Sequence, residues 1–372
     1  MLFFQRKKWW VFGILGILLS ECEEEKNIIV QPDKPQVAFS ENPTNQVRIF
    51  IGGDVNFSWE IEKTLQEDKD PFFFVKGIMR KADLTLVNLE TTIASNGIPQ
   101  TKTHVFRSSP SVLLWLTNAG IDVVSLANNH AMDYGAEAML EMREHLKAHG
   151  ILFAGAGKNW EEAIQPLIIT QKGISIGILC AGFQKPENLI ATANRPGTAG
   201  LRWKKLVKMI SQIRRKVDYL VFFVHWGWEY VVPPLDSEQV SNAYAVIDAG
   251  ADVIVGHHPH IIQAFEIYKG KPIFYSLGNF LFPQWRIEEA RPAIAVVLDI
   301  TKRESGIETI SYLIPLYRLS NTLQPVIASG KESEKVWEIV NSRSLLRGTN
   351  WTINPERKGW IPFWRIQIHP TP

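Results

Sequence analysis

The stretch DVIVGHHPH, residues 252–260, decides which fold this chain can adopt. Its first half is a run of mainly β-branched residues, which predicts a strand buried on both faces. Three of the nine histidines of the chain follow at once, and two of them, His258 and His260, are separated by a single residue. Side chains two apart on an extended segment point the same way, so we expect both imidazoles to face one site.

Six further strand-like apolar runs are spread along the chain. They are VRIFIGGD (47–54), DLTLVNLE (83–90), DVVSLANNH (122–130), ISIGILC (174–180), DYLVFFVHWG (218–227) and PIFYSLGNF (272–280). Helical patterns lie between several of them, such as 135–150 and 237–250, and both of these end in glycine, a common signal of a helix C-terminus. Strands that alternate with helices predict an α/β fold.

Composition describes an ordinary globular protein with a sizeable core. The 372 residues are 45% hydrophobic and 21% charged. The formal net charge is +2, which gives no strong field for nucleic acid, so we expect no nucleic-acid partner. The two cysteines, Cys22 and Cys180, are too differently placed to form a disulfide framework.

The first residues read as an export segment. A basic start is followed by WWVFGILGILLS (9–20), which is shorter than the roughly 20 apolar residues that span a membrane and suits a secretory signal. Cys22 then resembles the lipidated cysteine of a bacterial lipoprotein, although Glu21 departs from the small residue expected before it. We expect an export segment at 1–22 and a polar linker at 23–46. We expect the protein to be extracytoplasmic, in the bacterial cell envelope, and anchored to the membrane by a lipid or by an uncleaved N-terminal segment.

Polar residues gather at the C-terminal ends of the apolar runs, the edge where open α/β sheets bind ligands. They are Asp54, Glu90, Asn128, Asn129, His130, His225, His258, His260 and Asn279. Carboxylate, amide and imidazole groups are ligands of manganese, iron and zinc. Singly, each residue has a structural alternative, such as a turn cap for Asp54 or a core histidine for His225. Together they predict a metal site.

Six blocks carry a resemblance to a known family. In order, they are GGDVNFS (52–58), VNLETTI (87–93), SLANNHAMDYG (125–135), VHWGWEY (224–230), GHHPHIIQ (256–263) and YSLGNFLF (275–282). Over about residues 47–300 the chain resembles the CapA family of poly-γ-glutamate capsule synthesis proteins, related to the calcineurin-like metallophosphoesterases. The resemblance implies a calcineurin-like metallophosphatase fold, two mixed β-sheets sandwiched between flanking helices. Residues 301–372 would then be a C-terminal extension that packs on this domain.

The resemblance also implies two divalent metal ions, of manganese, iron or zinc, between the sheet edges. It assigns the first ion to Asp54, Asn56, Glu90 and His260, and the second to Glu90, Asn129, His225 and His258. Asn56 stands where the superfamily has a histidine, and an amide is a poorer ligand, so the first site is expected to be the weaker one. Glu90 replaces the bridging aspartate, and His257 has no ligand counterpart.

Further roles are expected around these ligands. His130 matches the catalytic histidine, and Asp133 is the nearest carboxylate that could orient it. Asn128, Glu229 and Asn279 are expected to support the ligands from behind, with a solvated loop carboxylate as the alternative for Glu229. Lys102, Arg107 and Arg195 lie on loops and are candidates for binding an anionic substrate, with ordinary solvated charges as the alternative.

Two classes of function remain open at this point. The first is a metal-dependent hydrolase that cleaves a phosphoester or a γ-glutamyl amide. The second is a non-catalytic surface protein that binds or helps to export an anionic polymer. In both cases the expected partners are an anionic polymer or a small anionic substrate, together with other membrane proteins of capsule synthesis or export.

Overall fold

The computed structural model describes residues 43–67, 69–232, 237–284, 286–345, 352–358 and 361–367. All of them belong to one compact unit, Pro35–Pro372. The expected export segment at 1–22 and most of the expected linker at 23–46 lie outside the described residues. Among the helices of the described ranges, none is long and apolar enough to cross a membrane.

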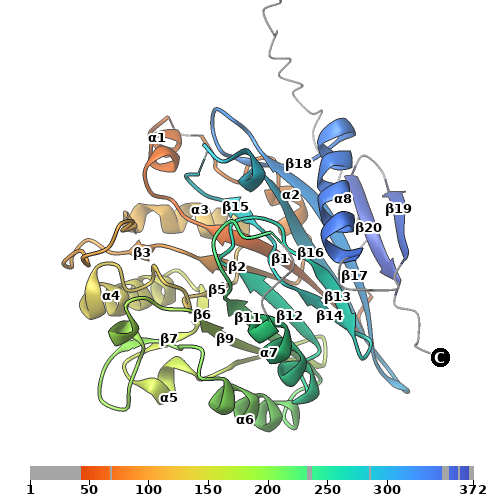
Figure 1. Ribbon diagram of the computed structural model, residues 1–372, viewed down its shortest axis with the longest axis horizontal. Coiled ribbons are helices and arrows are strands. Elements are labelled where there is room, and N and C mark those ends of the chain that lie inside the picture. The colour runs from red at the N-terminus through yellow and green to blue at the C-terminus, as the bar shows by residue number, and fades with distance from the viewer. Residues whose placement is uncertain are drawn as a thin grey trace, which may run out of the picture. The chain divides into compact units, whose positions relative to one another are not determined.

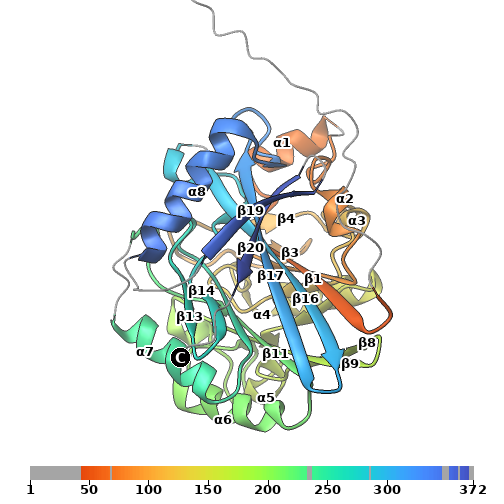
Figure 2. The ribbon, with the colours of Figure 1, turned by 90° about the vertical axis from the view of Figure 1, so that its right-hand side faces the viewer.

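The larger sheet is mixed and has ten strands (Figure 1). Its path is β19 (Thr352–Lys358), β20 (Ile361–Gln367), β17 (Gly306–Arg318), β16 (Pro292–Arg303), β1 (Gln46–Val55), β2 (Leu84–Leu89), β5 (Val123–Ser125) and β6 (Leu152–Ala154), with β15 (Asn279–Leu281) beside β1 and β18 (Pro325–Ile327) beside β17. From β1 to β6 the neighbours are parallel, whereas β16 and β17 form a long antiparallel hairpin (Figure 2).

The smaller sheet has six strands. Its order is β13 (Phe265–Tyr268), β14 (Lys271–Phe274), β12 (Val253–His257), β11 (Tyr219–His225), β9 (Ile174–Gly182) and β8 (Leu167–Gln171), with the four inner strands parallel and the two edge strands antiparallel. Two short pairs complete the strands, β3 (Thr92–Ile93) with β4 (Arg107–Ser108) and β7 (Ala156–Gly157) with β10 (Gly197–Thr198).

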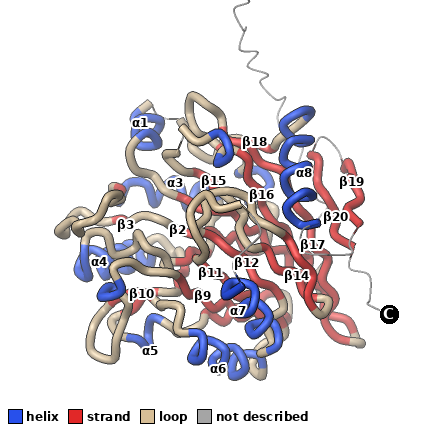
Figure 3. Tube along the Cα trace, in the orientation of Figure 1, coloured by secondary structure: helices blue, strands red, loops and turns tan. Residues whose placement is uncertain are grey.

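Helices lie around the outside of the strands (Figure 3). The α-helices are α1 (Glu60–Gln66), α2 (Lys76–Met79), α3 (Leu113–Ala119), α4 (Gly135–Ala148), α5 (Trp160–Ala163), α6 (Trp203–Arg214), α7 (Ser237–Asp248) and α8 (Gly330–Leu345). The 3-10 turns are η1 (Pro110–Val112), η2 (Glu187–Leu189) and η3 (Glu288–Ala290). α1 to α4 contribute to the core on the outer face of the larger sheet, and α5, α6 and α7 contribute to the core on the outer face of the smaller sheet.

The core is divided as a two-sheet sandwich requires. Along β1, Ile49 and Ile51 belong to an apolar cluster shared with the smaller sheet, whereas Phe50 belongs to the cluster under α1 to α4. This alternation with period two lets a single strand bury both of its faces. The prediction of two mixed sheets between flanking helices is confirmed.

The prediction that His258 and His260 lie on an extended segment is wrong. The strand of the opening stretch ends at His257, so His258 and His260 lie in the turn that follows and not on an extended segment. Both have positive φ, 97° and 59°, a backbone region that L-residues seldom adopt. Strain of this kind gathers at functional sites when the surrounding structure fixes it. The two imidazoles do face one site, but a turn places them there.

Candidate metal centre

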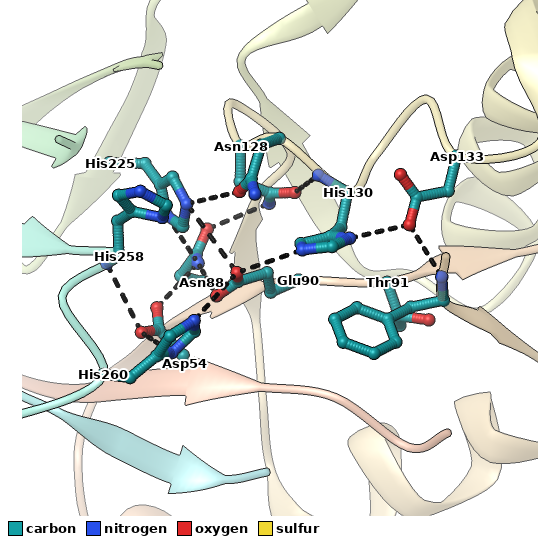
Figure 4. A network of polar contacts seen from close by, with 12 residues as sticks. Asp54, Asn88, Glu90, Thr91, Asn128, His130, Asp133, His225, His258 and His260 are labelled. Carbon is teal, nitrogen blue, oxygen red and sulfur yellow. Dashed lines mark hydrogen bonds and ion pairs between the residues drawn. The ribbon is translucent and has the colours of Figure 1, made fainter. Parts of the chain in front are cut away.

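The candidate site lies where the carboxyl ends of strands from both sheets meet. Asp54 on β1 is in register with Asn88 on β2 and with Asn279 on β15. In the other sheet, His225 at the end of β11 pairs with His257 at the end of β12. Parallel neighbours bring their carboxyl ends to one edge, so residues scattered along the sequence converge. Figure 4 shows side chains from these strand ends and the adjoining loops pointing toward one another.

Acidic and histidine side chains are grouped here closely enough to hold metal ions. In each of three sets, one ligand atom per residue lies within 4.8 Å of the others: Asp54, Glu90 and His260; Glu90, His225 and His258; and Glu229, His258 and His260. Only Glu229 among them is exposed. Glu90 belongs to two of the sets, which is the placement that a carboxylate shared by two ions requires.

The unpaired carboxylate oxygen of Glu90 and the histidines around it fit a divalent cation. Glu90 Oε1 is buried and has no hydrogen-bond partner among the described residues. The Nε2 atoms of His130, His225 and His260 surround it at 3.9, 3.7 and 3.7 Å, too far for hydrogen bonds. Two ligands of one tetrahedral ion, each about 2.1 Å from it, lie about 3.4 Å apart. The surroundings of Glu90 Oε1 are therefore close to the spacing of a ligand shell.

Burial sets the protonation of the candidate ligands. Burial lowers the pKa of His225 well below its usual value and lowers the pKa of His258 to about 3, with the neighbouring histidines adding to the effect. Both imidazoles are therefore neutral at pH 7, the form that binds metals. Burial, with the charges of Asp54 and Glu229, raises the pKa of Glu90 well above its usual value. A bound cation would favour its ionised form.

Asn88, which the sequence analysis did not single out, lies at the centre of the network. Its amide nitrogen donates to Asp54 Oδ1 at 2.8 Å and lies 3.2 Å from His225 Nδ1. Its amide oxygen accepts a bond from Asn128 Nδ2 at 3.1 Å. Asn88 precedes Glu90 by two residues, and period-two alternation along the strand could have placed both on one face. Asn88 orients one candidate ligand from each sheet.

His130 is held between Asp133 and the carboxylate of Glu90. Its Nδ1 lies 2.7 Å from Asp133 Oδ2, and its Nε2 faces Glu90 Oε1. Asp133 is fully buried, accepts a bond from Phe106 N at 2.7 Å and forms an ion pair with Lys102 at 2.5 Å. Burial lowers the pKa of His130 to about 4, although the contact with Asp133 raises it.

The expected amide residues fall into two groups. Asn129 Oδ1 lies 2.8 Å from His225 Nε2, so it faces the candidate ligands. Asn128 and Asn279 support them from behind: Asn128 Oδ1 accepts from His130 N at 3.0 Å, and Asn279 Oδ1 lies 2.9 Å from His260 Nδ1.

The side chain of Asn56, by contrast, is hydrogen-bonded within its own turn. Its oxygen accepts a bond from Ser58 N at 2.8 Å. It belongs to the residue types that fold back on the neighbouring backbone in this way. The acceptor expected at the first metal position is therefore engaged elsewhere.

The three expected substrate-binding cations are differently placed. Lys102 reaches the site, but its ammonium group is engaged by Asp133 and by the Asn129 carbonyl oxygen at 2.6 Å. Arg107 is exposed and lies over the ring of Tyr134, 4.5 Å from the centroid. Arg195 is exposed and donates to the Ile190 carbonyl at 3.2 Å. Of the three, only Lys102 contacts the residues of the site.

Aromatic rings surround the candidate ligands. Phe282 lies 4.5 Å from His260 and Phe183 lies 5.5 Å from His258, measured between ring centroids. Trp228 is 58% exposed beside Phe183, and Lys185 Nζ lies over both rings at 5.3 and 5.6 Å. Next to the polar centre of the site, the rings of Phe183 and Trp228 thus form an apolar surface covered by the cation of Lys185.

Known proteins are similar in sequence to this chain. The family described as "Bacterial capsule synthesis protein PGA_cap" matches residues 48–284. The PGA biosynthesis protein CapA of Bacillus subtilis is 34% identical over 261 residues, 68% of each chain. The capsule biosynthesis protein CapA of Bacillus anthracis is 32% identical over 239 residues, 63% of this chain and 56% of that protein. A probable polyglutamine synthesis accessory protein of Mycobacterium tuberculosis is 32% identical over 211 residues, 53% and 55% of the two chains.

Solved structures show weaker likenesses. NAD nucleotidase of Haemophilus influenzae is 13% identical, with a TM-score of 0.42 over 80% of this chain and 62% of that one. The sulfate thiohydrolase SoxB of Thermus thermophilus is 14% identical, with a TM-score of 0.40 over 73% and 44%.

Proposed function

The chain belongs to the PGA_cap family of bacterial capsule synthesis proteins, and from this premise we propose that it is a metal-dependent hydrolase acting on an anionic capsule polymer. The observation that carries the proposal is the position of Glu90. This buried carboxylate is shared by two sets of candidate ligands and also faces His130. A site built only for structural stability would not leave an oxygen of a buried carboxylate without a partner.

The candidate ligands divide into two groups around Glu90. Asp54 and His260 would hold one ion, and His225, His258 and Asn129 the other. Ions bound there would supply a nucleophile at neutral pH and would stabilise negative charge on the substrate. Asn88 and Asn279 keep the ligands in position. The histidines, neutral through burial, need no deprotonation to act as ligands.

His130 would transfer a proton to the leaving group. Asp133 accepts from its Nδ1, which fixes the ring orientation and directs Nε2 toward the candidate ion positions. In the neutral ring Nε2 would be free to accept a proton from the attacking water, and the imidazolium so formed could donate that proton to a leaving oxygen or nitrogen. The ring of Phe106, 4.2 Å from that of His130 between centroids, restricts the access of water to this side.

The polymer that we propose is poly-γ-glutamate or a related anionic chain. Support comes from the related proteins, whose names refer to PGA biosynthesis and to polyglutamine synthesis. The bond cleaved would be a γ-glutamyl amide or a phosphoester. Attachment to the outer face of the membrane through residues 1–22, beside other proteins of capsule synthesis or export, is part of the proposal and rests on the apolar run at 9–20.

Metal content and hydrolysis test this proposal together. The purified chain would be loaded with manganese, iron or zinc, dialysed, and assayed on a γ-linked glutamate oligomer and on bis-p-nitrophenyl phosphate. We expect bound metal and hydrolysis of one substrate, both lost in His258→Gln and both kept in His149→Gln, a variant at a half-buried position at the end of α4. Binding of the oligomer without metal or hydrolysis would favour the alternative, a surface protein that binds or helps to export the polymer.

A further inference from the structure

The first candidate ion position lacks a ligand. Its set of acidic and histidine side chains contains Asp54, Glu90 and His260, and Asn56 is the fourth expected member. The Asn56 oxygen is engaged by Ser58 N. Three protein ligands leave such a position open on one side.

Glu229 lies close to this opening. Its carboxylate is in one set with His258 and His260, with all three ligand atoms within 4.8 Å of one another. Each of these histidines also belongs to one of the two sets around Glu90, so the Glu229 carboxylate is adjacent to both candidate ion positions. His258 is 4% exposed, and its Nδ1 has no hydrogen-bond partner among the described residues. The set of Glu229, His258 and His260 therefore includes a buried nitrogen without a partner.

The backbone holds Glu229 in this place from both sides. Trp226 N donates to the His257 carbonyl at 3.0 Å, and Tyr230 N donates to the Pro259 carbonyl at 2.9 Å. The loop between these two bonds is thus tied to the turn that carries His258 and His260. Gly227 and Tyr230 both have positive φ, 82° and 59°, so the loop follows a tight path that most residues avoid.

We propose that Glu229 is a direct metal ligand, which supplies to the first ion the donor that Asn56 does not. The inference rests on the proposed function because it needs a metal at the site. A carboxylate is a suitable donor for manganese, iron or zinc, and Glu229 is exposed whereas the other candidate ligands are buried, which places it on the solvent side of the site. It would also reduce the net charge of two divalent ions, which face two buried carboxylates, Asp54 and Glu90.

Metal binding by Glu229→Gln tests the inference without recourse to activity. Glutamine keeps the length and one acceptor oxygen but removes the charge. A residue that only accepted a hydrogen bond from a histidine would largely keep its function in this variant. Glu187→Gln is the matched control, because Glu187 is also an exposed acid in the segment that follows a strand of the smaller sheet, at the start of η2. Metal content after dialysis and affinity by calorimetry with Mn²⁺ and Zn²⁺ would be measured for all three proteins.

We expect the wild type and Glu187→Gln to hold two ions and Glu229→Gln to bind one of them at least tenfold more weakly, since even residues behind the ligands contribute about 10- to 100-fold to metal affinity. If Glu229→Gln binds both ions within twofold of the wild type, the inference is wrong and the proposed function stands. If the wild type holds no metal, both are wrong.

Discussion

Replacing Asp133 with asparagine tests how the histidine of the site is held. Both oxygens of this carboxylate are engaged: Phe106 N donates to Oδ2, the His130 ring lies against the same oxygen, and the ammonium group of Lys102 forms an ion pair with Oδ1. Asparagine has only one acceptor oxygen, so its amide group must face at least one donor. Breaking a buried ion pair by removing one partner costs about 3–5 kcal/mol. Because the Lys102 side chain is 17% exposed, we expect the lower end, about 3 kcal/mol.

A double-mutant cycle with Lys102→Met isolates the ion pair. We expect the two changes together to destabilise the protein by less than their sum, with a coupling of about 1–3 kcal/mol. The assay is urea unfolding of the metal-free protein at pH 7, followed by tryptophan fluorescence. Glu67→Gln is the control: the Lys69–Glu67 pair has the same 2.5 Å distance, but its side chains are 49% and 62% exposed. It should cost no more than about 1 kcal/mol. Equal costs for Asp133→Asn and Glu67→Gln, or additive costs in the cycle, would refute the reasoning.

Three further predictions concern other parts of the protein. Without metal, the free energy of unfolding should fall as the pH is lowered from 6.5 toward 4, because four buried histidines with lowered pKa values bind protons in the unfolded chain but not in the folded one: His130, His225, His257 and His258. The raised pKa of Glu90 opposes this effect. A urea midpoint at pH 5 equal to that at pH 7.5 would contradict the prediction. Arg318→Met should lower the free energy of unfolding by about 3 kcal/mol, since the fully buried guanidinium donates to three backbone carbonyls that would lose their partner; a loss below 1 kcal/mol would show that water replaces it. Lys185→Met should weaken binding of a γ-linked glutamate oligomer severalfold and leave hydrolysis of a small phosphodiester unchanged, whereas Lys269→Met, at another lysine over an aromatic ring, should change neither; equal effects of both variants would exclude a specific contact.

The ends of the buried strands could be predicted from the sequence, because a strand buried on both faces is a nearly continuous run of apolar residues. Nearly continuous apolar runs marked β1, β2, β11 and β12, and each is followed or ended by a polar residue of the site. The family resemblance then named Asp54, Glu90 and His225, which the structure brings together. Short elements were harder to place. The predicted strand at 122–130 is regular only over Val123–Ser125. Asn128, which follows it, donates to the Asn88 side chain and to the Leu89 carbonyl on the adjacent strand β2.

Side-chain engagement could not be read from the sequence. Asn56 and Asn88 are the same residue type, each at the end of an apolar run, yet one folds back on Ser58 and the other joins the two sheets. Lys102 appeared free to bind an anion until the structure placed it on Asp133. These outcomes depend on which donors lie within about 3 Å, a quantity that no local pattern encodes.

The hydrogen bonds from Arg318 to a distant loop have a practical consequence for the design of truncated forms of this protein. Arg318 lies on β17, and its guanidinium donates to the carbonyls of Phe282, Gln284 and Ala290, the loop whose Phe282 ring lies against His260. A truncation at residue 300 would look harmless in an alignment that stops at 284, the last residue of the family match. It would release that loop and loosen one side of the candidate metal centre, so an inactive fragment of this kind would say nothing about the catalytic capacity of the intact protein.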